Sequence, residues 1–185
     1  MIKPLYITGY MGCGKTTFGR ALSAMCDVSF IDLDDYIERK SGKKINEIFC
    51  DKGEIFFRQL ESEALREIAD SDYKVVSCGG GTPCFNNNME FINKKGVTMW
   101  LDVSIERLFS RLWESCAERP LIAQLSPTEL RKKIEDDCKL RSGYYQKSSI
   151  RWDGNQLDNY DEIVDNIFHF VRTYPELGFA ITKPL

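Results

Sequence analysis

Residues 9–16 read Gly9-Tyr10-Met11-Gly12-Cys13-Gly14-Lys15-Thr16. This stretch matches the phosphate-loop pattern G-x-x-x-x-G-K-[ST] at every fixed position. A strand is predicted over residues 5–8 before it, and the apolar spacing from Phe18 to Met25 after it is typical of one helical face. Because glycines let backbone N–H groups converge on phosphate oxygens at a helix start, the stretch predicts a nucleotide-binding loop.

The loop also predicts individual roles. Lys15 is expected to neutralise the β- and γ-phosphates of ATP, and the Thr16 hydroxyl is expected to reach Mg²⁺. The residues expected to bind the nucleotide here are Gly12, Cys13, Gly14, Lys15, Thr16 and Thr17. A glycine turn that happens to precede a lysine is the alternative. The predicted strand before the loop and the helix after it disfavour that alternative.

Strand-like and helix-like segments alternate along the chain. Further strands are expected at 28–31, from 75, at 97–101 and at 149–152. The alternation predicts a three-layer α/β/α fold in which helices cover a five-stranded parallel sheet, as in P-loop kinases. A capping box at 126–129 begins a helix that is expected to end at Gly143. The 185 residues are expected to form one domain, with a tail over about 173–185.

Composition argues against several other classes of protein. The net charge of −3 gives no reason to expect nucleic acid or a membrane surface as the partner. No apolar run approaches the ~20 residues of a membrane span, and no signal peptide is visible. Seven cysteines without a C-x-x-C pair favour reduced thiols and a cytoplasmic location. A single histidine, His169, argues against a zinc site or a Ser-His-Asp triad.

The metal-side acid that P-loop enzymes usually carry has two candidate locations. The third predicted strand ends without an acid, whereas Asp32 and Asp34 follow the second and Asp102 follows the fourth. Alternation after a strand would point Asp32 and Asp34 to the same edge of the sheet. One could then hold Mg²⁺ through water while the other contacts an acceptor hydroxyl. Alternatively, Asp34 only caps the next helix, and Asp102 belongs to the start of another.

Arg58 and a run of glycines are candidates for binding the acceptor. On a predicted helix, Arg58 has Glu54 four residues before it and Glu61 three residues after it. These acids either form an exposed salt-bridge ladder or orient a guanidinium that binds a carboxylate. The consecutive glycines 79–81 either form a flexible turn or let a ligand approach the backbone. Together with the acids, these residues suit a hydroxylated carboxylic acid.

Two further arginines have open interpretations. Arg119 lies in an aperiodic segment at about 114–125, which is either a solvated loop or a mobile lid that delivers an arginine to the transferring phosphate. Arg141 is near the end of the capped helix, where a cation favours the helix dipole. It could equally face the acceptor.

Taken together, the motifs resemble those of the shikimate kinase family over about residues 2–170. The matching stretches are the phosphate loop, Asp32-Leu33-Asp34, residues 53–61, Gly79-Gly80-Gly81 and Arg119-Pro120-Leu121. The resemblance implies transfer of the γ-phosphate of ATP to the 3-hydroxyl of shikimate, which gives shikimate 3-phosphate and ADP in aromatic amino acid biosynthesis. It also implies a single kinase domain with a shikimate-binding segment at about 33–61. A monomer is expected.

The same resemblance implies roles for particular residues. Asp34 would orient or deprotonate the 3-hydroxyl, while Lys15 and Arg119 would stabilise the phosphoryl group. Thr16 and Asp32 would hold Mg²⁺. The residues implied to bind shikimate are Asp34, Phe49, Phe57, Arg58, Gly79, Gly80, Gly81 and Arg141. Those implied to contact ATP beyond the phosphate loop are Arg111, Arg119 and Asn155.

Three competing functions fit part of the pattern. A nucleoside monophosphate kinase shares the loop, but its acceptor phosphate would be repelled by Asp34, by ~1 kcal/mol or more per charge pair. A gluconate-type kinase would not be expected to combine the D-x-D motif with the glycine triplet. A nucleotide-binding regulator without activity has no need of an acceptor-side base.

Overall fold

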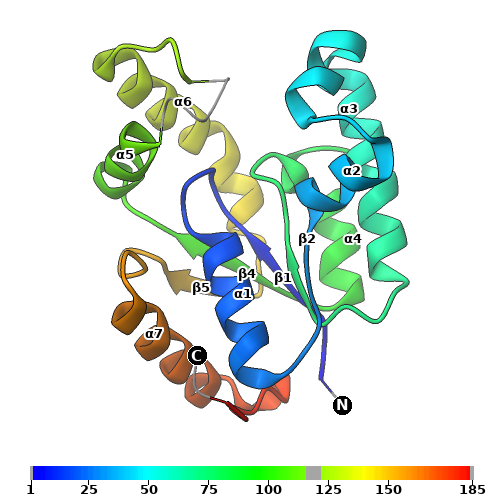
Figure 1. Ribbon diagram of the computed structural model, residues 1–185, viewed down its shortest axis with the longest axis vertical. Helices are drawn as coiled ribbons and strands as arrows, with labels where there is room; N and C mark the ends of the chain where they lie inside the picture. Colours follow the sequence, from blue (N-terminus) through cyan, green and yellow to red (C-terminus); the bar gives the residue numbers. More distant parts are fainter. Residues whose placement is uncertain (1, 116–121, 184–185) are drawn as a thin grey trace.

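The computed structural model describes residues 2–115 and 122–183. Within these residues a parallel sheet runs in the order β2-β3-β1-β4-β5. Its strands are β1 (Leu5–Thr8), β2 (Phe30–Asp32), β3 (Val75–Ser77), β4 (Val97–Asp102) and β5 (Ile150–Asp153). Helices cover both faces (Figure 1), which confirms the three-layer α/β fold with five parallel strands.

The helices divide between the two faces of the sheet. They are α1 (Lys15–Cys26), α2 (Leu33–Ser41), α3 (Ile45–Ala69), α4 (Asn88–Lys95), α5 (Ile105–Glu114), α6 (Pro127–Tyr145) and α7 (Tyr160–Thr173), with 3-10 turns η1 (Thr82–Cys84) and η3 (Pro175–Leu177). Alternate residues of β1 reach opposite cores, since Leu5 and Ile7 pack in the cluster that includes α1 and α7, and Tyr6 packs in the cluster with α3 and α4. None of the described helices combines the length and the apolar composition that crossing a bilayer requires.

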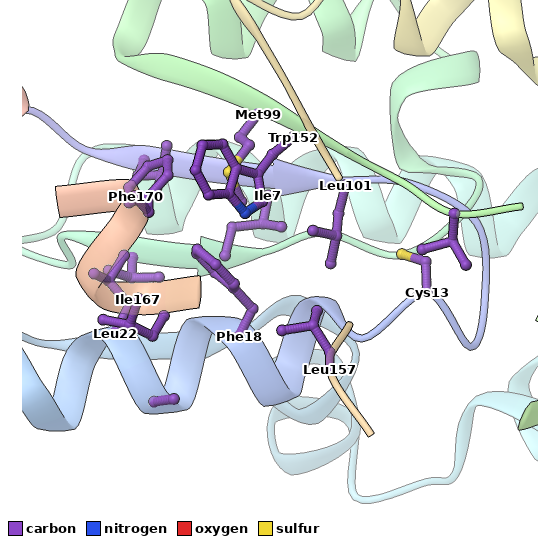
Figure 2. Packing of buried hydrophobic residues seen from close by; sticks show 14 of the residues in the cluster. Ile7, Cys13, Phe18, Leu22, Met99, Leu101, Trp152, Leu157, Ile167 and Phe170 are labelled. Atoms are coloured by element: carbon purple, nitrogen blue, oxygen red, sulfur yellow. The ribbon is translucent and has the colours of Figure 1, made fainter. Parts of the chain in front are cut away.

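The larger core fixes the helix that carries the phosphate loop. In Figure 2, Phe18 and Leu22 of α1 face Ile167 and Phe170 of α7 beneath the sheet. The rings of Phe18 and Phe170 meet edge to face, with their centroids 5.4 Å apart. Because these side chains are fully buried, α1 cannot shift without opening the core. The loop is therefore attached to a rigid support.

The segment after α7 joins this core. Leu177 and Phe179 are buried against it, and the Thr182 amide donates to the Met25 carbonyl at 2.8 Å, at the end of α1. The Lys3 amide donates to the Leu177 carbonyl at 3.3 Å. The described part of the tail expected at about 173–185 is thus packed against both the N-terminal strand and α1.

Several predicted boundaries were wrong. The prediction that Gly143 ends its helix fails, because α6 continues to Tyr145. Gly143 does not adopt a positive φ, so it has no C-capping conformation. The helix that carries Arg58 begins at Ile45, and Gly53 breaks it with a φ of 78°. In addition, β2 begins at Phe30 instead of residue 28.

The structure excludes one of the interpretations of Asp32 and Asp34. Asp32 is the N-cap of α2, and its Oδ1 accepts from the amides of Asp34 at 3.0 Å and Asp35 at 3.4 Å. The alternative in which Asp34 caps the helix is therefore wrong. Asp102 is the last residue of β4 and pairs with Arg151 at 2.6 Å, whereas the N-cap of α5 is Ser104.

Candidate active site

A cleft of about 640 Å³ lies at the carboxyl edge of the sheet. Its walls come from the phosphate loop and the start of α1, from Asp32 and Asp34, from residues 77–80 after β3, and from α5. Parallel α/β sheets bind ligands at this edge. The fold therefore brings the predicted nucleotide loop and the predicted acceptor acids into one cavity.

The phosphate loop is held by its own lysine. The Lys15 Nζ donates to the carbonyls of Gly9 and Tyr10, each at 2.9 Å. Gly12 and Gly14 have φ values of 76° and 100°, a conformation that favours glycine. Backbone amides at the start of α1 thus form an anion cradle that does not depend on a capping side chain.

Thr16 and Asp32 meet at the edge of this cradle. The Thr16 hydroxyl donates to Asp32 Oδ2 at 2.6 Å, and both residues line the cleft. A hydroxyl and one carboxylate fit Mg²⁺, which keeps several waters and takes further oxygens from substrate phosphates. In the described part of the chain, no group of three or more His, Cys, Asp or Glu side chains could hold a metal by itself. A bound phosphate would complete such a site.

Asp34 is a carboxyl group whose proton affinity is strongly altered. Burial, reinforced by the negative charges of Asp32 and Glu61, raises the pKa of Asp34 to about 7, although Lys15 opposes the shift. A group with a pKa near neutrality can accept a proton from a substrate hydroxyl and release it to solvent. This property is typical of acid–base residues in enzyme clefts.

Glu61 is fully buried, with 1% of its side chain exposed. Its Oε1 accepts from the Thr82 hydroxyl at 2.5 Å, and its Oε2 accepts from Arg58 Nη1 at 3.3 Å. Burial raises the pKa of Glu61, and the bonds from Thr82 and Arg58 act against that rise. The exposed-ladder interpretation is wrong for Glu61, whereas Glu54 is largely exposed and pairs with Arg58 at 3.0 Å.

Three aromatic rings surround the Arg58 guanidinium. Its Cζ lies 5.8 Å from the centroid of Phe49, 5.3 Å from that of Phe57 and 4.3 Å from that of Phe85. Phe49 and Phe57 were predicted from the sequence, and their rings are 4.5 Å apart. Phe85 was missed because it lies outside every motif.

Two of the three glycines after β3 bring the backbone close to charged side chains. A Cβ at Gly79 would lie 2.8 Å from Glu61 Oε1 and 3.0 Å from Asp34 Oδ1. A Cβ at Gly81 would lie 2.7 Å from Arg58 Nη1. The backbone of these glycines therefore packs directly against the side chains of Asp34, Arg58 and Glu61, which disfavours the flexible-turn interpretation.

Helix α6 brings Arg141 to the same region. Its Cζ lies 5.3 Å from the centroid of the Tyr10 ring, and its Nη2 lies 3.4 Å from Asp137. One turn later, the Tyr145 hydroxyl donates to the Gly80 carbonyl at 2.5 Å. Sequence reasoning missed Tyr145, although its i+4 spacing from Arg141 places it on the same helical face.

Arg111 lies on the nucleotide wall of the cleft, but Asn155 does not. Arg111 donates to the Cys13 carbonyl at 3.3 Å and to Asp158 at 2.7 Å. The Asn155 side chain instead accepts from the Ser104 amide at 3.0 Å, and Asn155 is not among the lining residues. Asn155 therefore bonds to the residue that caps α5, and Asp158, which was not predicted, lines the cleft.

The predicted site residues therefore fall into three groups. Those that line the cleft are Gly12, Gly14, Lys15, Thr16, Thr17, Asp32, Asp34, Gly79, Gly80 and Arg111. Those that lie beside it are Phe49, Phe57, Arg58, Gly81 and Arg141. The Cys13 carbonyl accepts a hydrogen bond from Arg111, which lines the cleft, whereas the Cys13 side chain is buried. Arg119 and part of the lid expected at about 114–125 lie outside the described residues.

Comparisons with known proteins agree with this geometry. The family model for shikimate kinase matches residues 11–172. A shikimate kinase from Parabacteroides distasonis is 41% identical over 165 residues, which cover 89% of this chain and 95% of the relative.

Solved structures give the same picture. A shikimate kinase from Bacteroides thetaiotaomicron superposes with a TM-score of 0.92 at 35% identity, covering 95% of this chain and 99% of the other. One from Acinetobacter baumannii, solved in complex with shikimate, gives a TM-score of 0.83 at 29% identity and covers 95% and 94% of the two chains.

Proposed function

The chain belongs to the shikimate kinase family, and we propose that it uses this cleft to transfer the γ-phosphate of ATP to the 3-hydroxyl of shikimate. The products are shikimate 3-phosphate and ADP, a step in aromatic amino acid biosynthesis. One observation supports the proposal most strongly. The phosphate loop and the half-buried carboxyl group of Asp34, whose pKa is raised to about 7, line the same cleft.

On the nucleotide side, the chain binds and orients the triphosphate. Backbone amides of the loop and the ammonium of Lys15 neutralise the phosphate oxygens. Arg111 lies against the loop and the lining residue Asp158. Thr16 and Asp32 would hold Mg²⁺, which supplies positive charge to the phosphates when it is bound.

On the acceptor side, Asp34 takes the proton of the attacking hydroxyl. Its raised pKa means that it holds a proton well enough to act as a base near neutral pH. Positive charges bind the carboxylate of shikimate. Arg58 provides a planar guanidinium that suits bidentate binding, and Arg141 lies close to Gly80. Phe49 and Phe57 form an apolar wall beside the ring.

An acceptor screen tests the proposed function. ADP release from Mg-ATP is measured with shikimate, gluconate, AMP or no acceptor, with the enzyme concentration held constant. We expect rapid release with shikimate and a low background with the others. Turnover with AMP but not with shikimate would show that the cleft accepts a phosphate, and turnover with gluconate alone would indicate a different sugar acid.

We further propose a cytoplasmic, monomeric enzyme with a shikimate-binding segment at about 33–61. Asp34 and Arg58, the two acceptor groups of opposite charge, both fall within this segment. Size-exclusion chromatography with light scattering checks the oligomeric state. A mass of about 21 kDa is expected, because the chain has a mass of 21.3 kDa.

A further inference from the structure

The segment 85–88 follows η1 and includes the first residue of α4, and it contacts Arg58 of helix α3. The Phe85 ring lies against the guanidinium, with Cζ 4.3 Å from the ring centroid. This ring is closer than those of Phe49 and Phe57, at 5.8 and 5.3 Å. A ring at this distance covers one face of the guanidinium, so its N–H edge is left for carboxylates.

Asn86 ties the same segment to the backbone of α3. Its Nδ2 donates to the Arg58 carbonyl at 2.9 Å and to the Ser62 hydroxyl at 2.9 Å. Asn86 has a φ of 50°, in the left-handed region that asparagine tolerates better than most residues. The turn therefore presents an amide directly to the helical turn that carries Arg58.

Asn88 extends the contact to the buried acid. It is fully buried, and its Nδ2 donates to the Ser62 hydroxyl at 3.0 Å and to the Thr82 carbonyl at 3.1 Å. The Thr82 hydroxyl in turn donates to Glu61. A network of hydrogen bonds thus joins the segment that follows the glycines to Glu61 and to the backbone of Arg58.

We propose that segment 85–88 is a positioning element, in which Phe85 and Asn86 set the place of the Arg58 guanidinium and thereby the affinity for the acceptor's carboxylate. The inference rests on the proposed function, which supplies shikimate as that acceptor. The Gly81 backbone also lies close to the guanidinium, because a Cβ added at Gly81 would be 2.7 Å from Arg58 Nη1. Neither Phe85 nor Asn86 is expected to take part in the chemical step.

A matched pair of glycine variants tests the proposal. Asn86→Gly removes the amide that binds α3 and keeps a backbone suited to positive φ. Asn87→Gly is the control, because Asn87 has a φ of 55° and its side chain makes no capping bond to α4. Asn86→Gly should raise KM for shikimate by about 2- to 10-fold, the range of one hydrogen bond. Its kcat and its KM for ATP should stay within about twofold of wild type, and Asn87→Gly should change none of the three.

A second measurement reports on Arg58 without any turnover. The proton on Arg58 Nε lies in the ring-current field of Phe85, so its NMR signal should shift in Phe85→Leu. The signal should also shift or broaden in Asn86→Gly and remain unchanged in Asn87→Gly. A wild-type KM for shikimate together with an unchanged Arg58 signal in Asn86→Gly would overturn the positioning role. If the wild-type protein fails to phosphorylate shikimate while Asn86→Gly still shows the expected NMR change, the proposed function alone would be overturned.

Discussion

The two sides of the cleft are built in different ways. On the proposed nucleotide side, residues 9–17 with α5, backbone amides would bind the anion, and the Lys15 ammonium already bonds two carbonyls within the loop. The acceptor side, made of Asp34, Arg58, Glu61 and the glycines 79–81, consists of charged side chains packed closely together. Burial raises the pKa of both acids there. The nucleotide side is thus largely complete before the ligand binds, whereas the acceptor side contains charge that a ligand can still engage.

This difference means that substitutions on one side should leave the other nearly unchanged. The largest expected effect is that of Asp34→Asn, which removes the base but keeps the shape. We expect kcat to fall by about 10²- to 10⁴-fold, the usual range for a general base. The Kd for ATP, measured by calorimetry, should stay within about twofold of wild type. An equal loss of ATP affinity would show that Asp34 belongs to the metal site instead.

Substitution of Arg58 should mainly change KM for shikimate. Arg58→Lys keeps the positive charge and loses the planar fork, so it should raise this KM by roughly 10- to 100-fold, the range of a charged hydrogen bond. Glu54→Gln is the control, because Glu54 is largely exposed and its ion pair should contribute little. Steady-state kinetics at saturating ATP measures both. An unchanged KM in Arg58→Lys would show that the carboxylate binds elsewhere.

Smaller effects are expected on stability, and two buried threonines, Thr82 and Thr8, allow a comparison. Thr82→Val removes the hydroxyl that donates to the buried Glu61, and should lower the free energy of unfolding by about 1–3 kcal/mol. Thr8→Val removes a hydroxyl whose partners are both neutral, the Met99 carbonyl at 3.1 Å and the Ser148 hydroxyl at 3.1 Å, and should cost about 0.5–1.5 kcal/mol. Urea unfolding at pH 7 measures the free energy of unfolding of both variants. Equal losses would mean that the charge on Glu61 does not matter.

The phosphate loop could be predicted from the sequence for a physical reason. The phosphate loop is a local structure, in which adjacent residues supply every group that the anion needs. Asp32 and Asp34 were also located correctly, but the reason given was wrong. They reach the same cleft because α2 begins at Leu33, so that Asp34 lies in its first turn and Asp32 is its cap.

The missed residues depend on contacts between distant segments. Burial of Glu61 requires Thr82, which lies 21 residues further along the chain. The contact between Phe85 and Arg58 likewise requires α3 to pack against the segment after η1. Helical spacing places Glu61 beside Arg58 but cannot show that it is covered. Such residues follow from tertiary packing, which no local pattern in one sequence reveals.

The pH dependence of kcat/KM for shikimate tests the central claim most directly. A carboxyl group is neutral below its pKa and anionic above it, and only the anion can accept the proton. Since the pKa of Asp34 is raised to about 7 in the free enzyme, kcat/KM should rise about tenfold per pH unit below 7 and level off above it. Asp34→Asn should lack this rise. A wild-type profile that stays flat from about pH 5.5 to 8 would contradict the assignment of Asp34 as the base.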